Sequence, residues 1–310
     1  MEIIHLSVDT PMQVHDSVCA LGFFDGVHLG HQQLLKEVEH IAKEKGLKKA
    51  IMTFSVHPKQ ILENNDYHYL MSLSEKINIL KQWQFDYFYI IDFDQTVANL
   101  KPNIFLQNYI INHQIKHVVC GFDFHFGKNG QGDTHFLKNI QKENFSVDII
   151  EEYDVDRVKV SSSFIRNKLE EGQLEQANQL LSRPYRISGK VIYGLQNGRK
   201  IGFPTANVDA GHYVILKKGV YGVYFYHDGK RYLGMANVGL NPTVGEITKI
   251  SLEVNVFDFD EDIYGKHIKL YFISKIRNEK KFNSLEEEVE YLRMEVEFLK
   301  KLRALSRNLK

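Results

Sequence analysis

The sequence predicts an α/β chain with two parts: an N-terminal doubly wound parallel sheet, and a C-terminal antiparallel β-barrel with a closing helix. As far as Ser182, short apolar runs alternate with helical patterns, which is typical of a parallel sheet covered by helices. From Tyr185 onward the apolar residues alternate with period two, as in antiparallel strands. A chain of 310 residues is long enough for two domains. We therefore expect domains at residues 1–183 and 184–310, joined near Ser182-Arg183-Pro184.

Five apolar runs in the first domain predict strands that are buried on both faces of the sheet. These strands are expected at Val18–Leu21, Ala50–Phe54, Tyr87–Ile91, Val118–Cys120 and Val147–Ile150. Parallel sheets of this kind bind their ligands beyond the carboxyl ends of the strands. The segments that directly follow the strands are therefore the candidates for a binding site.

Three helical patterns lie between these runs. In Gln32–Lys45 the apolar residues share one face, and Gly46 suits a C-cap. Ser74–Trp83 begins with a serine, which can cap the free amides of a helix. Pro102–Gln114 begins with a proline, which is favoured at the first helical position.

The second domain contains a clear hairpin pattern. Tyr221–His227 and Lys230–Leu233 alternate around Asp228-Gly229, which predicts a type I′ turn. Further strands are expected at Leu252–Phe257 and Ile268–Ile273, and we expect the strands to close into a small barrel. The segment from Ser284 to about Leu305 is a long helical pattern whose apolar stripe should pack on the barrel. The stripe consists of Leu285, Val289, Leu292, Val296 and Leu299.

The composition of the chain argues against several classes of protein, including nucleic-acid-binding and membrane-spanning proteins. The 39 basic and 39 acidic residues balance to a net charge of zero, which argues against a nucleic-acid partner. No run approaches the roughly 18 apolar residues that a transmembrane helix needs, and the N-terminus lacks a basic and apolar leader. Cys19 and Cys120 both lie in apolar runs, which predicts buried free thiols. We expect a cytoplasmic enzyme whose partners are small molecules, without a membrane or a nucleic acid. The sequence leaves the oligomeric state open.

The most informative segment is Gly22–His31, which reads Gly-Phe-Phe-Asp-Gly-Val-His-Leu-Gly-His and joins the first predicted strand to the first predicted helix. The first amides of a helix lack partners within the helix and can bind phosphate. His28 and His31 lie beside that helix start and can donate hydrogen bonds where phosphoryl charge develops. A pair three apart can arise by chance among 14 histidines, but its place at a strand-to-helix turn favours function. His-x-Gly-His in this setting resembles the signature of nucleotidylyltransferases.

Three other segments of the first domain have functional and structural explanations. Thr53–Pro58 closes the second strand, although His57 alone is a weak indication of a site. Gly121–Gly127 follows the fourth strand, and its aromatic residues beside Asp123 suit a planar ring, or else belong to a glycine-rich loop with a buried core. Ser161–Arg166 opens a helix and brings hydroxyls, amides and a guanidinium together, although an ordinary N-cap would also contain serines.

The second domain contains the segment Gly-Arg-Lys-Ile-Gly-Phe-Pro-Thr-Ala-Asn at residues 198–207. Its glycines allow the backbone to approach phosphates closely. Thr205 and Asn207 are two residues apart, so in an extended chain their oxygens point the same way, and Mg²⁺ accepts such oxygens. Glu253 lies mid-strand among apolar residues, where a solvent-facing carboxylate is the alternative to a site residue.

Together these segments resemble the bacterial bifunctional riboflavin kinase/FAD synthetases, over nearly the whole chain. Gly22–His31 matches the family pattern Gly-x-Phe-Asp-Gly-Val-His-x-Gly-His throughout. Val56 replaces a usual proline, and Ser163 replaces a threonine while keeping its hydroxyl. The resemblance implies a Rossmann-like nucleotidylyltransferase fold for the first domain and a riboflavin kinase barrel for the second. It also implies Mg²⁺ as cofactor, and ATP, riboflavin, FMN and FAD as substrates and products.

The resemblance implies a role for each matched position. The ATP-binding residues would be Gly22, Phe24, Asp25, Gly30, His31, Ser162, Ser163 and Arg166 in the first domain, and Gly194, Gly198, Arg199, Gly202, Thr205 and Asn207 in the second. The flavin-binding residues would be His57, Pro58, Asp123, Phe124, Phe126, Asn237, Glu253 and Arg277. His28, His31 and Arg166 would act in adenylyl transfer, Glu253 would be the base for phosphorylation, and Thr205 and Asn207 would hold the metal.

The last helix departs from the family pattern. The family usually has a Gln-Ile pair followed, after two intervening residues, by Asp, where this chain has Tyr291, Leu292 and Glu295. One alternative is therefore an FAD synthetase whose barrel binds flavin without efficient kinase activity. Another is a flavin-binding regulator without catalysis, although such a protein has no use for both the histidine pair and Glu253.

Overall fold

The computed structural model describes residues 1–7, 10, 15–64, 66–194, 203–242, 248–280 and 282–307. By packing, the chain divides into two compact units, Met1–Ser162 and Ser163–Lys310. The second unit contains the barrel and two helices that precede it, α7 (Ser162–Glu171), apart from its first residue, and α8 (Leu174–Leu181). The domain boundary between residues 183 and 184 stays a prediction from the sequence.

The first unit contains a six-stranded parallel sheet, which confirms the predicted fold class. Its strands, in spatial order, are β1 (Glu2–Leu6), β4 (Tyr87–Ile91), β3 (Lys48–Phe54), β2 (Ser17–Leu21), β5 (Ile115–Gly121) and β6 (Ser146–Ile150). Successive strands run from β2 to one side as far as β4, and the chain then returns to the other side of β2 as β5. The carboxyl ends of β2 and β5 therefore form the topological switch point, where sheets of this class bind ligands.

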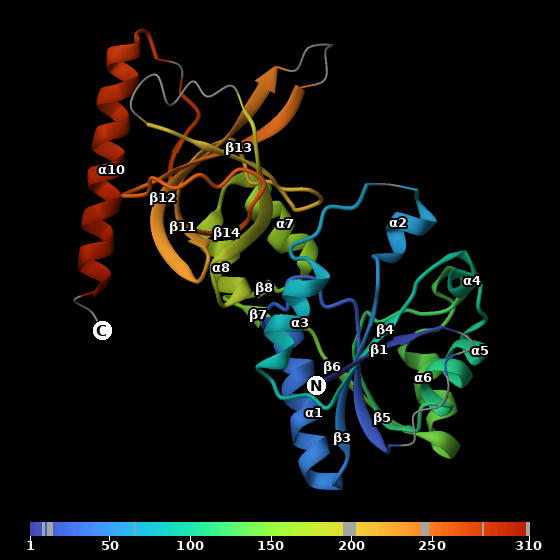
Figure 1. Ribbon diagram of the computed structural model, residues 1–310. Coiled ribbons are helices and arrows are strands. Elements are labelled where there is room, and N and C mark those ends of the chain that lie inside the picture. Colours follow the sequence, from blue (N-terminus) through green and yellow to red (C-terminus); the bar gives the residue numbers. More distant parts are fainter. Residues whose placement is uncertain are drawn as a thin grey trace. The chain divides into compact units, whose positions relative to one another are not determined.

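Helices cover both faces of this sheet (Figure 1). On one face α1 (Leu29–Lys45) and α3 (Leu73–Lys81) pack around Val18 and Ala20 of β2. On the other face α5 (Pro102–Leu106) and α6 (Thr134–Asn144) pack around Cys19. The remaining helices are short: α2 (Pro58–Leu62), α4 (Gln95–Ala98), the π-helical turn Gln107–Ile111 that continues α5, and the 3-10 turn Lys128–Gly130. A small two-stranded sheet joins β7 (Asp154–Val155) to β8 (Val158–Lys159).

Several local predictions are confirmed and others are corrected. Both cysteines are buried free thiols, and Gly46 caps α1 in the left-handed conformation, with φ of 65°. The predicted start of α3 at Ser74 is wrong, because Ser72 caps this helix and forms a capping box with Glu75. The sequence pattern does not indicate β1, because this edge strand is mostly exposed and lacks an apolar run.

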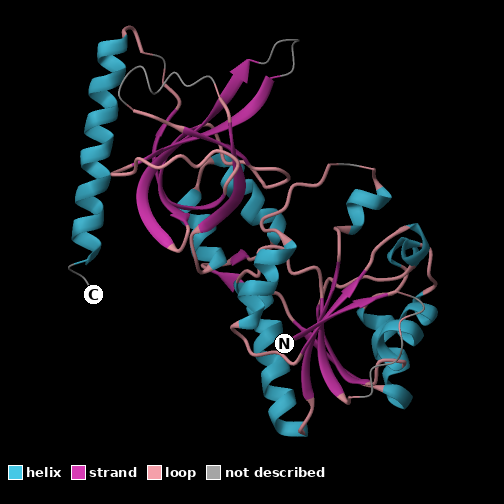
Figure 2. Ribbon diagram, in the orientation of Figure 1, coloured by secondary structure: helices cyan, strands magenta, loops and turns pink. Residues whose placement is uncertain are grey.

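The second unit contains a closed antiparallel barrel of six strands (Figure 2). Around the barrel the order is β10 (Ala206–Asp209), β13 (Thr248–Val256), β12 (Lys230–Pro242), β11 (Gly219–His227), β14 (His267–Asn278) and β9 (Tyr185–Ile192). Asp228 and Gly229 both have positive φ, 46° and 73°, which confirms the type I′ hairpin turn.

The long helix α10 (Leu285–Arg307) packs on the barrel, as the apolar stripe predicts. Leu292, Val296 and Leu299 contact a cluster that includes Val220 and Met235. These three residues of the stripe therefore pack between the helix and the barrel wall. In the described part of the chain, no helix combines the length and the apolar content that crossing a membrane requires.

Candidate active sites

The first candidate site is the loop between β2 and α1, at the switch point of the sheet. Phe24 and Val27 adopt positive φ, 55° and 39°, which is rare for residues other than glycine and is found where surrounding contacts enforce it. Asp25, between these two residues, makes the hydrogen bonds that hold this loop conformation. Its carboxylate accepts from the backbone amide of Leu70 at 3.0 and 3.2 Å, and its carbonyl accepts from the Ser162 hydroxyl at 2.8 Å. Asp25 and Ser162, both expected to bind ATP, thus also hold the loop in shape.

The two histidines of this loop lie together at the start of α1. His28 is the N-cap, and its Nδ1 accepts from the amide of His31 at 3.2 Å. Accepting at Nδ1 leaves Nε2 of a neutral His28 ring as the donor. The two rings stack with centroids 3.6 Å apart. A Cβ at Gly30 would lie 3.2 Å from the His28 ring and 3.3 Å from the Val160 carbonyl, which is tighter than ordinary contact, so glycine leaves more room beside the His28 ring than any other residue.

An aromatic group lies at the carboxyl end of β3. His57 is the N-cap of α2, directly before Pro58, and its ring stacks on Tyr67 with centroids 3.9 Å apart. Phe23 meets the His57 ring edge-on at 4.7 Å. Tyr69 accepts a hydrogen bond from the His57 amide at 3.3 Å. No sequence motif singles out Phe23, Tyr67 or Tyr69, although two tyrosines two residues apart in a polar segment are a usable signal for a surface that binds a ring.

The loop after β5 contains Asp123, Phe124 and Phe126, all predicted to bind flavin. Asp123 is exposed and Phe124 is half-buried. Phe126 is only 3% exposed, and its ring packs on Phe105 and Phe124 at 5.4 and 5.7 Å. Phe126 therefore belongs to the core beneath the loop, and of the three predicted flavin-binding residues Asp123 and Phe124 remain accessible.

Ser163 and Arg166 both lie on α7, within the second unit. Ser162 begins this helix, and Arg166 lies about one turn further along it. The roles of Ser163 and Arg166 in ATP binding stay predictions from the sequence.

The second candidate site is a row of polar side chains across three strands of the barrel. Glu253 of β13 lies opposite Asn207 of β10 on one side and opposite Asn237 of β12 on the other. Residues directly opposite in antiparallel strands share a face. The Thr205 hydroxyl donates to Glu253 Oε2 at 3.3 Å. A carboxylate, a hydroxyl and two amides therefore meet at one place, and the oxygens of Thr205 and Asn207 fit the donor set that Mg²⁺ prefers.

Glycine makes this row possible at its edge. A Cβ on Gly194 would lie 2.1 Å from the amide nitrogen of Asn207, closer than any real contact, so Asn207 occupies space that only glycine leaves free. A cavity of about 460 Å³ lies beside the row, with Thr205, Val254, Phe259 and Tyr264 among its lining residues. This volume is typical of small-molecule sites. The predicted ATP-binding residues Gly198, Arg199 and Gly202 lie outside the described residues.

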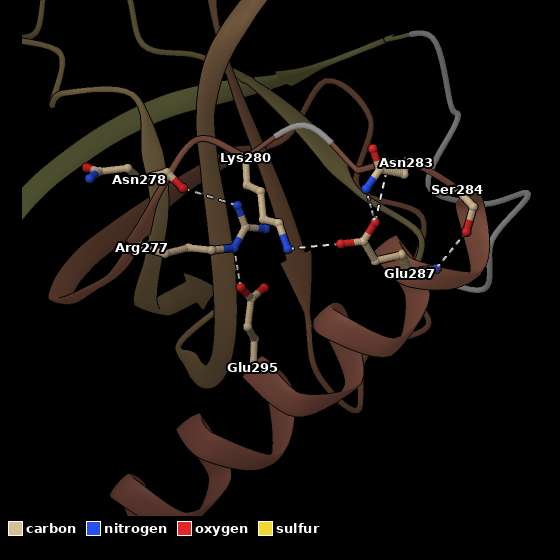
Figure 3. Close-up of polar contacts among 7 residues, drawn as sticks. All are labelled: Arg277, Asn278, Lys280, Asn283, Ser284, Glu287 and Glu295. Carbon is tan, nitrogen blue, oxygen red and sulfur yellow. Dashed lines mark hydrogen bonds and ion pairs between the residues drawn. The ribbon is translucent and has the colours of Figure 1, made fainter.

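The predicted flavin-binding residue Arg277 pairs with α10 (Figure 3). Its Nε donates to the buried carboxylate of Glu295, and its Nη1 donates to the carbonyl of Asn278 at 3.2 Å. Glu287 binds Lys280 at 3.0 Å and the amide of Asn283 at 2.9 Å near the start of the same helix. The glutamate that departs from the family pattern thus still supplies a carboxylate to Arg277. The closing helix is held to the end of β14 by charged contacts as well as by its apolar stripe.

Comparison with known proteins points to one family. Family models match over residues 10–164, described as FAD synthetase, and over residues 181–304, described as riboflavin kinase. The bifunctional riboflavin kinase/FMN adenylyltransferase of Listeria monocytogenes is 41% identical over 274 residues, 87% of each chain. The protein of the same name from Bacillus subtilis is 41% identical over 281 residues, 89% of each chain. A crystal structure titled Macrolide-efflux Protein from Streptococcus pneumoniae is 32% identical, with a TM-score of 0.88, and covers 96% of this chain and 98% of that chain.

Proposed function

We propose roles for the residues of both sites from the premise that the chain belongs to the bifunctional riboflavin kinase/FMN adenylyltransferase family. The enzyme phosphorylates riboflavin with ATP to give FMN, and it then transfers AMP from a second ATP to FMN, giving FAD and pyrophosphate. The segment that matches FAD synthetase performs adenylyl transfer, and the segment that matches riboflavin kinase performs phosphorylation.

Adenylyl transfer needs positioning and charge stabilisation more than it needs a base. The nucleophile is an oxygen of the FMN phosphate, which is already ionised because its second pKa is about 6. It forms a bond to the α-phosphorus of ATP while the bond to pyrophosphate breaks. The amides of Leu29 and Gly30 at the start of α1 and the ring donors of His28 and His31 stabilise the charge that develops on the phosphoryl oxygens. Gly22, Phe24 and Gly30 shape the loop, and Ser162, Ser163 and Arg166 bind the ATP phosphates.

In the first unit, the segments that follow β3 and β5 bind the flavin. His57 and Pro58 begin α2, and the stacked rings of His57 and Tyr67 present a flat aromatic surface. Asp123 and Phe124 supply an acceptor and a ring from the neighbouring loop. Such a surface suits a planar isoalloxazine ring.

Phosphorylation of riboflavin does need a base, because the attacking 5′-hydroxyl is neutral. Glu253 accepts its proton as the oxygen attacks the γ-phosphorus of ATP and ADP leaves. Asn237 and Arg277 hold the flavin near this carboxylate. Thr205 and Asn207 would hold Mg²⁺, which offsets the negative charge on the phosphates when bound. Gly198 and Gly202 let the backbone approach those phosphates and Arg199 supplies a positive charge to them, while Gly194 leaves the room that Asn207 occupies.

The observation that carries the proposal is that the histidine pair and Glu253 lie in different units, each with polar neighbours of its own. His28 and His31 meet at the switch point of the sheet, and Glu253 lies between Asn207 and Asn237 on the barrel. The alternatives, an FAD synthetase with an inactive barrel or a regulator without catalysis, gain no support from relatives named for both activities. We also propose that the enzyme is cytoplasmic and has no nucleic-acid or membrane partner. The net charge of zero agrees with the absence of a nucleic-acid partner.

Product analysis tests this proposal directly. The protein is incubated with riboflavin, ATP and Mg²⁺, and separately with FMN, ATP and Mg²⁺, and the flavins are resolved by chromatography. We expect FMN and FAD in the first reaction and FAD in the second. If riboflavin yields no FMN, the kinase assignment is wrong, and if FMN yields no FAD, the adenylyltransferase assignment is wrong.

A further inference from the structure

Helix α3 contains a lysine that is buried beneath the first site. Lys76 is 3% exposed, and its ammonium donates to the carbonyl of Phe23 and lies 3.4 Å from the hydroxyl of Thr53. The ammonium also lies 4.0 Å from the centre of the Phe23 ring, on its face. In the described part of the chain, no carboxylate forms an ion pair with it. Only neutral groups therefore contact this cation directly.

A buried cation of this kind is costly for stability alone. Removing an ammonium from water costs several kcal/mol, and a methionine of similar length would fill the same space without that cost. Lys76 lies on the buried face of α3 together with Leu80, and the buried face of an amphipathic helix normally has apolar residues. The nearest stabilising charge is Asp25, which attracts the ammonium through space while its carboxylate binds the Leu70 amide.

The groups that Lys76 contacts all belong to the first site. Phe23 lies in the loop that leads to His28 and His31, and Thr53 is the last residue but one of β3. Thr53 itself donates to the Phe23 carbonyl at 3.0 Å, so this carbonyl accepts from two side chains. The Phe23 ring, in turn, meets the His57 ring. One buried charge is thus connected to both the phosphate-binding loop and the aromatic surface.

We propose that Lys76 is a positioning residue for adenylyl transfer. Its charged ammonium holds the carbonyl and the ring of Phe23, which sets the loop of His28 and His31 and the edge of the aromatic surface. It also places a positive charge behind a site that must bind several phosphates. This inference rests on the proposed function of the first unit.

We expect Lys76 to lose its charge at mildly alkaline pH. Burial lowers the pKa of Lys76 to about 8, although Asp25 opposes this shift. Burial raises the pKa of Cys120 to about 12 and that of Cys19 well above its usual range, so neither of these thiols loses its proton near pH 8. The FMN phosphate keeps its charge over this range. The kcat/KM for FAD formation should therefore fall as the pH rises through about 8, because this parameter reports the free enzyme.

The test compares Lys76→Met with Lys76→Arg, and uses Lys81→Met, an exposed lysine of the same helix, as the matched control. We expect Lys76→Met to lower kcat/KM for FAD formation between about tenfold and 10²-fold at neutral pH, the cost of a slightly misplaced site. The fall above pH 8 should disappear in Lys76→Met and move upward in Lys76→Arg, because arginine stays charged. Lys81→Met should match the unmutated protein, and FMN formation from riboflavin should be unchanged in all three.

Several outcomes would overturn the proposal. If the unmutated protein makes FAD with constant kcat/KM up to about pH 9.5, no lysine titrates in its site. This test uses the unmutated protein alone, so it can be made even if Lys76→Met fails to fold. Lys76→Met with unchanged activity and an unchanged pH profile would show that the lysine has no positioning role. A purely structural lysine would lower the thermal unfolding temperature while leaving the pH profile in place. Unmutated protein that makes no FAD at any pH would instead overturn the proposed function of the first unit.

Discussion

Replacing Gly194 with alanine should impair the kinase while leaving the fold and the other activity intact. The new Cβ would lie 2.1 Å from Nδ2 of Asn207, against the 3.4 Å of ordinary contact, so the amide must move by about 1.3 Å. The atoms in the way are the end of a flexible side chain, so the barrel can keep its strands. Asn207 is, however, a proposed metal ligand, and a displacement of about 1 Å in a catalytic site costs about 10² in rate.

The assay measures steady-state FMN production from riboflavin by Gly194→Ala. We expect kcat to fall about 10²-fold, with FAD formation from supplied FMN and the thermal unfolding temperature close to those of the unmutated protein. Gly239→Ala is the matched control, because its Cβ would meet Asn237, Ser251 and Glu279 at 3.6 to 3.7 Å, which is ordinary contact. Kinase activity of Gly194→Ala within about threefold of the unmutated protein would refute the reasoning, because a 1.3 Å shift would then be harmless. Equal losses in both variants would refute it as well.

Three further predictions concern the histidines and the proposed base. His31→Ala should lower FAD formation about 10²-fold or more, the loss for one charge-stabilising donor, while FMN formation persists; equal loss of both activities would instead indicate misfolding or a shared site. Glu253→Gln should lower kcat for FMN formation about 10²- to 10⁴-fold with little change in riboflavin affinity by calorimetry, and undiminished turnover would exclude Glu253 as the base. His117 is buried, and its ring lies 3.0 Å from Lys45 Nζ and 2.9 Å from Asp148. Burial and the neighbouring Lys45 lower the pKa of His117, so the unfolded chain binds a proton at a higher pH than the folded protein does. The contribution of neutral His117 to the free energy of unfolding should therefore be present above about pH 6.5 and be lost as the pH falls below it. Thermal unfolding at several pH values should show this dependence weakened in His117→Gln, and an unchanged dependence would show that another group is responsible.

The sequence by itself determined the features that depend on near neighbours along the chain. Period-two alternation and the Asp228-Gly229 turn predicted the hairpin, and the turn has the expected positive φ values. Alternating strands and helices predicted the parallel sheet, and the stripe through Leu292 and Leu299 predicted the packing of α10. The histidine motif predicted a site at a strand-to-helix turn, because caps and turns depend on only a few consecutive residues. Even here the boundaries shifted, since Ser72 rather than Ser74 caps α3.

Only the tertiary structure decided which distant residues meet. The register between β12 and β13 places Asn237 beside Glu253, and a shift of one residue would have turned one of them to the other face. The binding of Asp25 to the amide of Leu70 joins residues 45 positions apart, which no local pattern encodes. The contact of Lys76 with Phe23 likewise depends on how α3 packs on the sheet. Pairing across strands and packing between layers are set by the whole fold, so a sequence can suggest candidate site residues without showing which of them touch.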